Sequence, residues 1–187
     1  MAKLVYQMGT SLDGYVEDAS GSIDWSVPPE DVHRIANENA RAASGFLFGR
    51  GLYEMMEPYW PDLAADPGDA HEIEAEFARE YVATPRIVFS DSLESVGEGV
   101  TLLPRAQARP EIERLKSESD GAFDIAGPTL AASVFDLIDE FRTWMNPVAL
   151  GGGKPYFPQG AGQLDLRLVE SRPCSGGVLY LRYERAG

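Results

Sequence analysis

A glycine turn between an apolar run and a helical pattern could bind a phosphate group. Residues 123–126 are mostly apolar and lead into Gly127, and Pro128, Thr129 and Leu130 follow in a segment of helical spacing. Backbone N–H groups at a helix start have no partner within the helix, so such a turn can hold a phosphate or diphosphate, helped by the helix dipole. The alternative is a plain strand-to-helix turn without a ligand.

A second glycine turn carries a fixed positive charge. Residues 46–48 form a compact apolar run, and Gly49-Arg50-Gly51 follows directly. The planar guanidinium of Arg50 suits phosphate recognition, and open α/β sheets bind ligands at the carboxyl ends of their strands. The alternative is a surface ion pair between Arg50 and Glu54, one helical turn further on.

An acidic group stands near a tryptophan at the start of a predicted helix. Glu30 and Asp31 follow Pro28-Pro29, a short distance after Trp25. In an apolar pocket beside Trp25, the pKa of Asp31 would rise and its carboxyl could donate or relay a proton. The alternative is a helix cap, because a helix N-terminus stabilises an anion.

Two further glycine-containing segments have both a structural and a ligand-binding interpretation. Residues 9–16 contain Asp13-Gly14, a pair typical of tight turns. Residues 150–157 contain three consecutive glycines and then Lys154, so the backbone there can approach other backbone or a ligand closely. The run lacks the Gly-Lys-Ser/Thr ending of a P-loop, so nucleotide hydrolysis is not supported. A bulge or turn that shapes the sheet is the alternative.

Strands and helices alternate along the chain, as in an α/β fold. We expect strands over 4–6, 46–48, 86–89, 100–103, 123–126 and 140–150, and helices over 31–43, 70–82, 110–117 and 129–138. Residues 58–69, rich in Pro, Asp and Gly, predict a loop. Alternating patterns at 164–169 and 178–183 flank a Gly-rich turn and predict a hairpin. The chain therefore predicts a mixed, mostly parallel sheet with helices on both faces and an antiparallel C-terminal hairpin.

Composition excludes several classes of protein. The 187 residues suffice for one domain over 1–187, and 16 Lys and Arg against 30 Asp and Glu leave a net charge of −14. This charge repels nucleic acid and acidic membrane surfaces. The lone Cys174 excludes a disulfide framework and a cysteine zinc cluster, and with only His33 and His71 we predict no metal site. A cytoplasmic protein that acts on a small molecule is expected, with no nucleic acid or membrane as partner.

The order of these pieces is more specific than any one of them. Along the chain come 11–14, Trp25, Gly49-Arg50 with Tyr53-Glu54, Ser90 after a strand, Gly127 before a helix, 137–140, and 147–157 with the glycine run. This order resembles the dihydrofolate reductase-like superfamily. It is most similar to the branch around the C-terminal reductase domain of the bifunctional riboflavin-biosynthesis deaminase–reductase. The resemblance spans residues 3–183.

The resemblance implies an eight-stranded sheet and an NADPH site at the strand ends. It places Gly9 and Val16 against the nicotinamide, and Gly49 and Arg50 against the phosphates. It places Ser90 near the adenosine 2′-phosphate. Against the diphosphate it places Gly127, Pro128, Thr129 and Leu130. It places Asp31 at the pocket acid, as the proton donor. Trp25 and Tyr15 fall on the substrate side.

The chain departs from the family pattern at several positions. Leu52 replaces the threonine of Gly-Arg-x-Thr, and Ala126 replaces the first glycine of the diphosphate turn. Residues 82–85 lack the arginine that grips the folate tail, which argues against dihydrofolate. Residues 57–61 lack the acidic-Pro-x-Leu-x-x-Arg stretch that binds the phosphoribosyl substrate of the riboflavin enzymes.

The sequence therefore predicts an NADPH-dependent reductase of a small pterin- or pyrimidine-like molecule, similar to 5-amino-6-(5-phosphoribosylamino)uracil reductase. Dihydrofolate reductase is one alternative. A non-catalytic protein that binds or senses NADPH is another, favoured by Leu52 and Ala126. A homodimer is also expected, because the apolar segment 178–183 could pair with its symmetry mate at a sheet edge.

Overall fold

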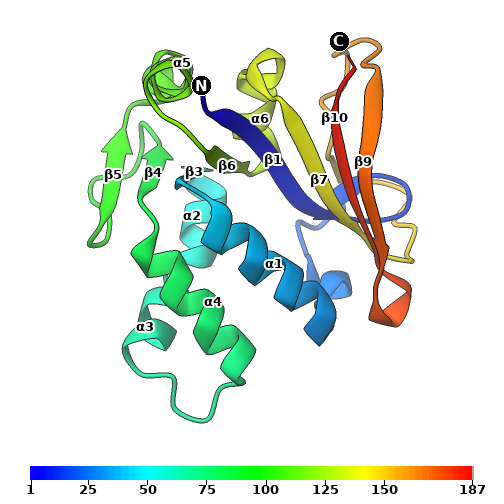
Figure 1. The fold of residues 1–187 in the computed structure, drawn as a ribbon, viewed down its shortest axis with the longest axis horizontal. Helices are drawn as coiled ribbons and strands as arrows, with labels where there is room; N and C mark the ends of the chain where they lie inside the picture. The colour runs from blue at the N-terminus through cyan, green and yellow to red at the C-terminus, as the bar shows by residue number, and fades with distance from the viewer. Residues whose placement is uncertain (187) are drawn as a thin grey trace.

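An eight-stranded sheet runs through the centre of the molecule (Figure 1). The structure is a computed structural model, and it describes residues 1–186. The strand order of the sheet is β5-β4-β3-β6-β1-β7-β10-β9. The strands are β1 (Lys3–Thr10), β3 (Gly45–Gly49), β4 (Arg86–Phe89), β5 (Val100–Leu103), β6 (Ala122–Ala126), β7 (Glu140–Met145), β9 (Leu166–Pro173) and β10 (Leu179–Arg185). Neighbouring strands from β5 to β7 are parallel, whereas β10 is antiparallel to both β7 and β9. The predicted mixed sheet and C-terminal hairpin are confirmed.

Helices cover both faces of this sheet, as predicted. The helices are α1 (Glu30–Ala42), α2 (Arg50–Met56), α3 (Trp60–Ala65), α4 (Glu72–Ala83), α5 (Ala108–Glu118) and α6 (Pro128–Ser133). One buried cluster joins α1, α2 and α4 to β3 and β4, and a second joins α5 and α6 to β1, β3 and β6. None of these helices, all within residues 1–186, has the length and hydropathy needed to cross a membrane.

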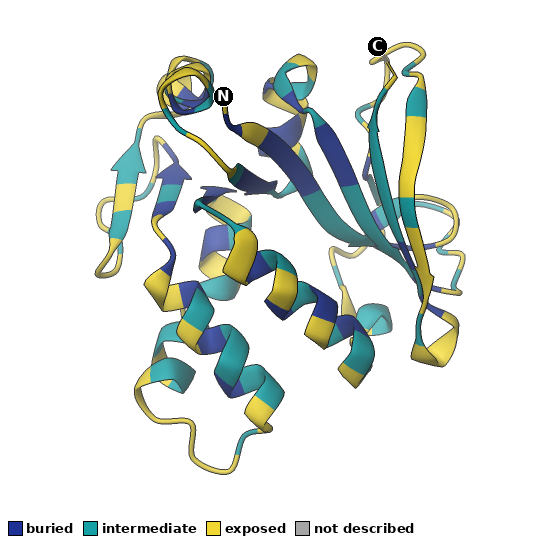
Figure 2. Cartoon of the chain, viewed as in Figure 1, coloured by how far each residue is buried: buried dark blue, intermediate teal, exposed yellow. Residues whose placement is uncertain are grey.

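The central strands are buried on both faces, which explains their nearly continuous apolar sequences (Figure 2). In β6, Phe123 and Ile125 belong to the cluster under α5 and α6, whereas Asp124 and Ala126 point to the face covered by α1 and α4. Because side chains alternate along a strand, an acidic residue between two apolar ones must enter the opposite layer. Asp124 is only 2% exposed.

Three sequence-based boundaries were wrong. Residues 58–69 contain α3, whose Pro61 lies in the first turn, where a missing N–H costs nothing. The indole of Trp60 packs 4.5 Å from the ring of Phe77 in α4, a tertiary contact that composition does not reveal. The helix expected over 129–138 ends at Ser133 and a 3₁₀ turn, Phe135–Leu137, follows it. The strand expected over 140–150 ends at Met145, opposite the last residue of β1, Thr10.

The dimer edge predicted at residues 178–183 is also wrong. These residues belong mainly to β10, which lies between β7 and β9 and therefore has both sides paired. The free edge on this side of the sheet is β9, where Leu168 and Val169 are exposed. A homodimer stays a prediction.

A small second sheet, which the sequence did not indicate, joins β2 (Tyr15–Glu17) to β8 (Lys154–Pro155). Gly153, just before β8, has a φ of 136°. The two strands lie so close there that a Cβ on Gly153 would be 2.0 Å from the carbonyl oxygen of Glu17. Only glycine fits this position. The expected close approach of backbone at the glycine run is confirmed.

Asp13 connects the turn after β1 to the same glycine run. Its carboxylate accepts hydrogen bonds from the Ser11 hydroxyl at 2.7 Å and from the backbone N–H groups of Leu150 and Gly151 at 3.0 and 2.7 Å. These donors, led by Ser11, lower the pKa of Asp13 to about 2. The Asp13-Gly14 turn therefore also positions the loop that leads to β8.

Asp13→Asn should destabilise the protein in a pH-dependent way. The pKa of Asp13 is lower in the folded state, so its contribution to stability is complete above the ordinary value of 3.8 and is lost as the pH falls towards about 2. Thermal unfolding of both proteins from pH 6 to pH 2 measures this. The gap in melting temperature should narrow in acid, and a gap that stays constant would contradict the assigned role.

Candidate functional site

The carboxyl ends of four parallel strands meet around a large cavity. The ends of β1, β3, β4 and β6 contribute Gly9, Gly49, Ser90 and Gly127 to its walls, and its volume is about 870 Å³. This volume lies towards the upper end of the range for ligand pockets, about 300–1,000 Å³. The structure brings together in it all the residues that the sequence predicted for the cofactor: Gly9, Val16, Gly49, Arg50, Ser90, Gly127, Pro128, Thr129 and Leu130.

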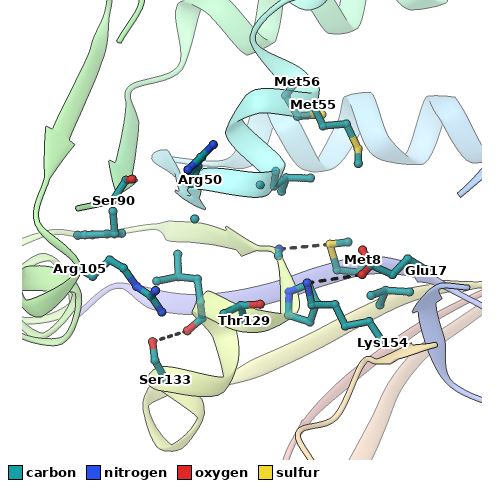
Figure 3. Close-up of a pocket in the computed structure, with 18 of the residues that line it drawn as sticks. Met8, Glu17, Arg50, Met55, Met56, Ser90, Arg105, Thr129, Ser133 and Lys154 are labelled. Carbon is teal, nitrogen blue, oxygen red and sulfur yellow. Dashed lines mark hydrogen bonds and ion pairs between the residues drawn. The ribbon is translucent and has the colours of Figure 1, made fainter. Parts of the chain in front are cut away.

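One end of this first cavity is positively charged. Figure 3 shows Arg50, Ser90 and Arg105 together on one side. Arg50 pairs with Glu54 at 2.7 Å, as the alternative interpretation held, and also donates to the Ser92 hydroxyl at 3.0 Å while lining the cavity. Within residues 1–186 the guanidinium of Arg105 has no hydrogen bond or ion pair of its own. This end can therefore bind an anion despite the net charge of −14.

The middle of the first cavity is formed by backbone. Gly127 precedes α6 with a φ of 94°, in the region that favours glycine, so the chain can turn sharply from β6 into the helix. The N–H groups of the first turn of α6, at Thr129 and Leu130, have no partner within the helix. Across the cavity, Gly49 and Gly51 present no side chain. These features suit an extended ligand with phosphate groups near its centre.

The other end of the first cavity is less charged and is formed by β1 and the small second sheet. Its lining residues are Met8, Gly9, Val16, Glu17 and Lys154. The side chains of Glu17 on β2 and Lys154 on β8 form an ion pair at 3.6 Å (Figure 3). The sequence reasoning missed Arg105, Ser92, Glu17 and the methionines of this cavity, because their place depends on how loops and the small sheet pack.

A second, smaller cavity of about 230 Å³ opens beside this end, between the sheet and α1 and α4. It shares Met8, Gly9, Leu52 and Met56 with the first cavity, so the two meet at β1 and α2. Its other walls are Gln7, Ala36, Ala40, Phe46, Phe48, Phe77, Tyr81, Asp124, Ala126 and Trp144. A mostly apolar cavity of this size, with five aromatic side chains in its walls, suits a small planar molecule.

Asp124 is the acidic residue of the second cavity. Its Oδ2 accepts a hydrogen bond from Gln7 Nε2 at 2.7 Å. Gln7 in turn accepts from Asn39 at 3.2 Å, and Asn39 accepts from Arg142 at 2.9 Å. Burial raises the pKa of Asp124 to about 7, against a lowering by Arg142, and Glu140 adds to the rise. Asp124 was not predicted as a site residue, although an acid inside the apolar run 123–126 is a sequence signal for a buried carboxyl group.

The structure does not bring the predicted acid and substrate residues to either cavity. Asp31 lies in the first turn of α1, where its carboxylate accepts from Val32 N and, at 2.7 Å, from Ser175 N in the turn between β9 and β10. These contacts, led by Ser175, lower the pKa of Asp31. Trp25 donates to the Ser22 carbonyl, and Tyr15 pairs with Pro155 in the small sheet. Their functional roles stay predictions.

Residues 2–180 match the sequence pattern of the family described as the RibD C-terminal domain. The chain belongs to this family. A RibD C-terminal domain relative over nearly the whole length is the uncharacterized protein YyaP of Bacillus subtilis, 24% identical over 99% of this chain and 96% of YyaP.

Solved structures agree with the RibD C-terminal domain assignment. A putative riboflavin biosynthesis protein from Shewanella sp. PV-4 superposes with a TM-score of 0.72 and 26% identity, covering all of both chains. Dihydrofolate reductase from Enterococcus faecalis, complexed with NADP(H), superposes with a TM-score of 0.65 and 15% identity over 99% of this chain and 97% of that one. The dihydrofolate reductase-like fold is thereby confirmed.

Asp124→Asn should stabilise the protein increasingly as the pH rises. The pKa of Asp124 is raised in the folded state, so the acid form favours folding below the ordinary value of 3.8 and this contribution is lost as the pH rises to about 7. At about 1.4 kcal/mol per pH unit, the variant gains up to about 4 kcal/mol relative to wild type across this window. Urea unfolding of both proteins from pH 4 to pH 8 measures the difference, and a difference independent of pH would contradict the burial of this charge.

Proposed function

We propose that this RibD C-terminal domain is an NADPH-dependent reductase of a small planar molecule, similar to the reductase of riboflavin biosynthesis. The observation that carries the proposal is the arrangement of the two cavities. A large cavity with a cationic end and a glycine-lined middle adjoins a small, mostly apolar cavity, and the two share Met8 and Gly9.

The residues of the first cavity fit NADPH in the order in which its groups are linked. Arg50, Arg105 and Ser90 would hold the adenosine 2′-phosphate. Gly49 and the turn from Gly127 to Leu130 would hold the diphosphate. Gly9 and Val16 would border the nicotinamide, at the junction with the second cavity. When bound there, NADPH supplies a hydride for an unsaturated C–N or C–O carbon, whose neighbouring atom takes a proton.

The aromatic walls of the second cavity exclude water from the place where a substrate would meet the nicotinamide. Phe46 and Phe48 come from β3 and Phe77 comes from α4, so aromatic rings line the cavity from the sheet and from the helix that covers it. Exclusion of water protects a hydride transfer from side reactions and strengthens every hydrogen bond to the substrate. Dihydrofolate is the alternative substrate. The absence of a tail-binding arginine from residues 82–85 argues against it.

A protein that binds or senses NADPH without catalysis is the second candidate. Leu52 lines both cavities at the position where the family pattern has a phosphate-binding hydroxyl, and the loss of that hydroxyl favours a sensor over a reductase. Incubation with NADPH and a panel of pterins and pyrimidines separates the two candidates. Loss of NADPH absorbance with one of the panel supports the reductase, and binding of NADPH without any oxidation supports the sensor.

Arg105→Gln should weaken NADPH binding by about 10-fold to 100-fold, because a hydrogen bond to a charged group contributes about 1.5–3 kcal/mol. NADH, which has no 2′-phosphate, should bind both proteins equally. Calorimetry at fixed ionic strength measures each affinity. Arg109→Gln is the matched control, since Arg109 pairs with Asp136 outside the cavity and its loss changes the net charge equally. No heat with NADPH for the wild type would refute the proposed function.

Asp31→Asn tests the predicted proton donor. If Asp31 delivers the proton, the variant loses turnover while its NADPH affinity stays within about twofold of wild type. The position of Asp31 beside Ser175 instead favours a loss of thermal stability, since one backbone donor of the hairpin turn loses an anionic acceptor. Steady-state turnover with a substrate found in the panel, measured beside a melting curve, decides between the two roles.

A further inference from the structure

The second cavity presents one carboxyl group from an otherwise nearly apolar wall. We propose that Asp124 binds the substrate of the second cavity, and that this substrate is a planar molecule without a phosphate whose nitrogen edge donates N–H groups or carries a positive charge. The inference rests on the proposed function in taking the second cavity as the substrate site.

The hydrogen bonds around Asp124 leave room for a ligand. Gln7 can turn only its Nε2 towards Asp124, because its Oε1 is held by the Asn39 amide, which Arg142 orients in turn. Oδ2 of Asp124 is thereby occupied, and among residues 1–186 no donor reaches Oδ1. A carboxylate with one filled and one open oxygen favours a ligand with N–H donors.

The charges that face Asp124 do not neutralise it. Arg142 on β7 lowers the pKa of Asp124 but forms no ion pair with it, because its Nε pairs at 2.6 Å with Glu140. Glu140 also pairs with Arg182 of β10 at 2.7 Å. From α4, the Tyr81 hydroxyl donates to Glu57 instead. Asp124 is thus a buried carboxyl with a neutral partner only, and a buried carboxylate is costly without a cation or several donors. A ligand with a cationic edge removes that cost.

The same walls disfavour a phosphate. Among the described residues that line the second cavity, none is Arg or Lys. Asp124 and the net charge of −14 both repel an anion. The volume of about 230 Å³ is below the usual range for drug-sized ligands, about 300–1,000 Å³, and suits one or two fused rings. The cations needed for a phosphate lie instead at the far end of the first cavity.

Calorimetry with benzamidine tests this inference, because benzamidine is a planar ring with a permanently charged amidinium and no phosphate. Only ionised Asp124 binds it, so the affinity of the wild type should rise about tenfold per pH unit from pH 5 and level off above about pH 7. Asp124→Asn should lower the affinity at least about 30-fold at pH 8 and remove the pH dependence. Benzoate and uridine 5′-monophosphate should bind neither protein at this site.

Asp120→Asn is the matched control, because Asp120 is fully exposed, lines neither cavity and carries the same charge. Its benzamidine affinity should equal that of the wild type. Benzamidine binding that is absent, independent of pH, or unchanged in Asp124→Asn overturns the inference, as does tighter binding of benzoate or the monophosphate. NADPH calorimetry on the same samples separates the two proposals: if only the NADPH signal is missing, the proposed function fails and the role of Asp124 stands.

Discussion

The parallel pairing of β1, β3, β4 and β6 is the constraint on which the rest of the molecule depends. Parallel strands end at one edge, so the residues that follow them must meet there although they are far apart in the sequence. Gly9, Gly49, Ser90 and Gly127 each occupy such an end. The first cavity is the direct result of this geometry, and its glycines keep the strand ends open to a ligand.

The same constraint explains what could be predicted from the sequence. Apolar runs such as 46–48 and the turn at Gly127 are local signals, because burial on both faces and a positive φ restrict the residue types directly. The turns at Gly49-Arg50 and at Gly127 were therefore found by their place after a strand, whereas Gly9, Val16 and Ser90 were assigned through the family resemblance. Arg105 was not, because it reaches the cavity from the 3₁₀ turn Arg105–Gln107, and no spacing in the sequence relates that turn to Arg50.

The second cavity shows the opposite situation. Its walls come from β1, β3, β6, β7, α1, α2 and α4, and its acid stands on a strand, whereas the family resemblance directed attention to the first turn of α1. Asp31 and Asp124 differ in one physical respect that sequence did not resolve. Asp31 is met by backbone donors at the surface, which lower its pKa, whereas Asp124 is buried in the wall of the second cavity, and burial raises its pKa.

The walls shared by the two cavities link their occupants. A molecule that fills the first cavity as far as Met8 and Gly9 becomes part of the lining of the second, and its surface then faces whatever enters there. If occupants of the two cavities touch there, each would change the affinity for the other, and by thermodynamic reciprocity the factor would be the same in both directions. The shared wall at Met8 and Gly9 thus gives direct contact between two occupants, rather than movement of the protein, as the route by which binding at one site would affect binding at the other.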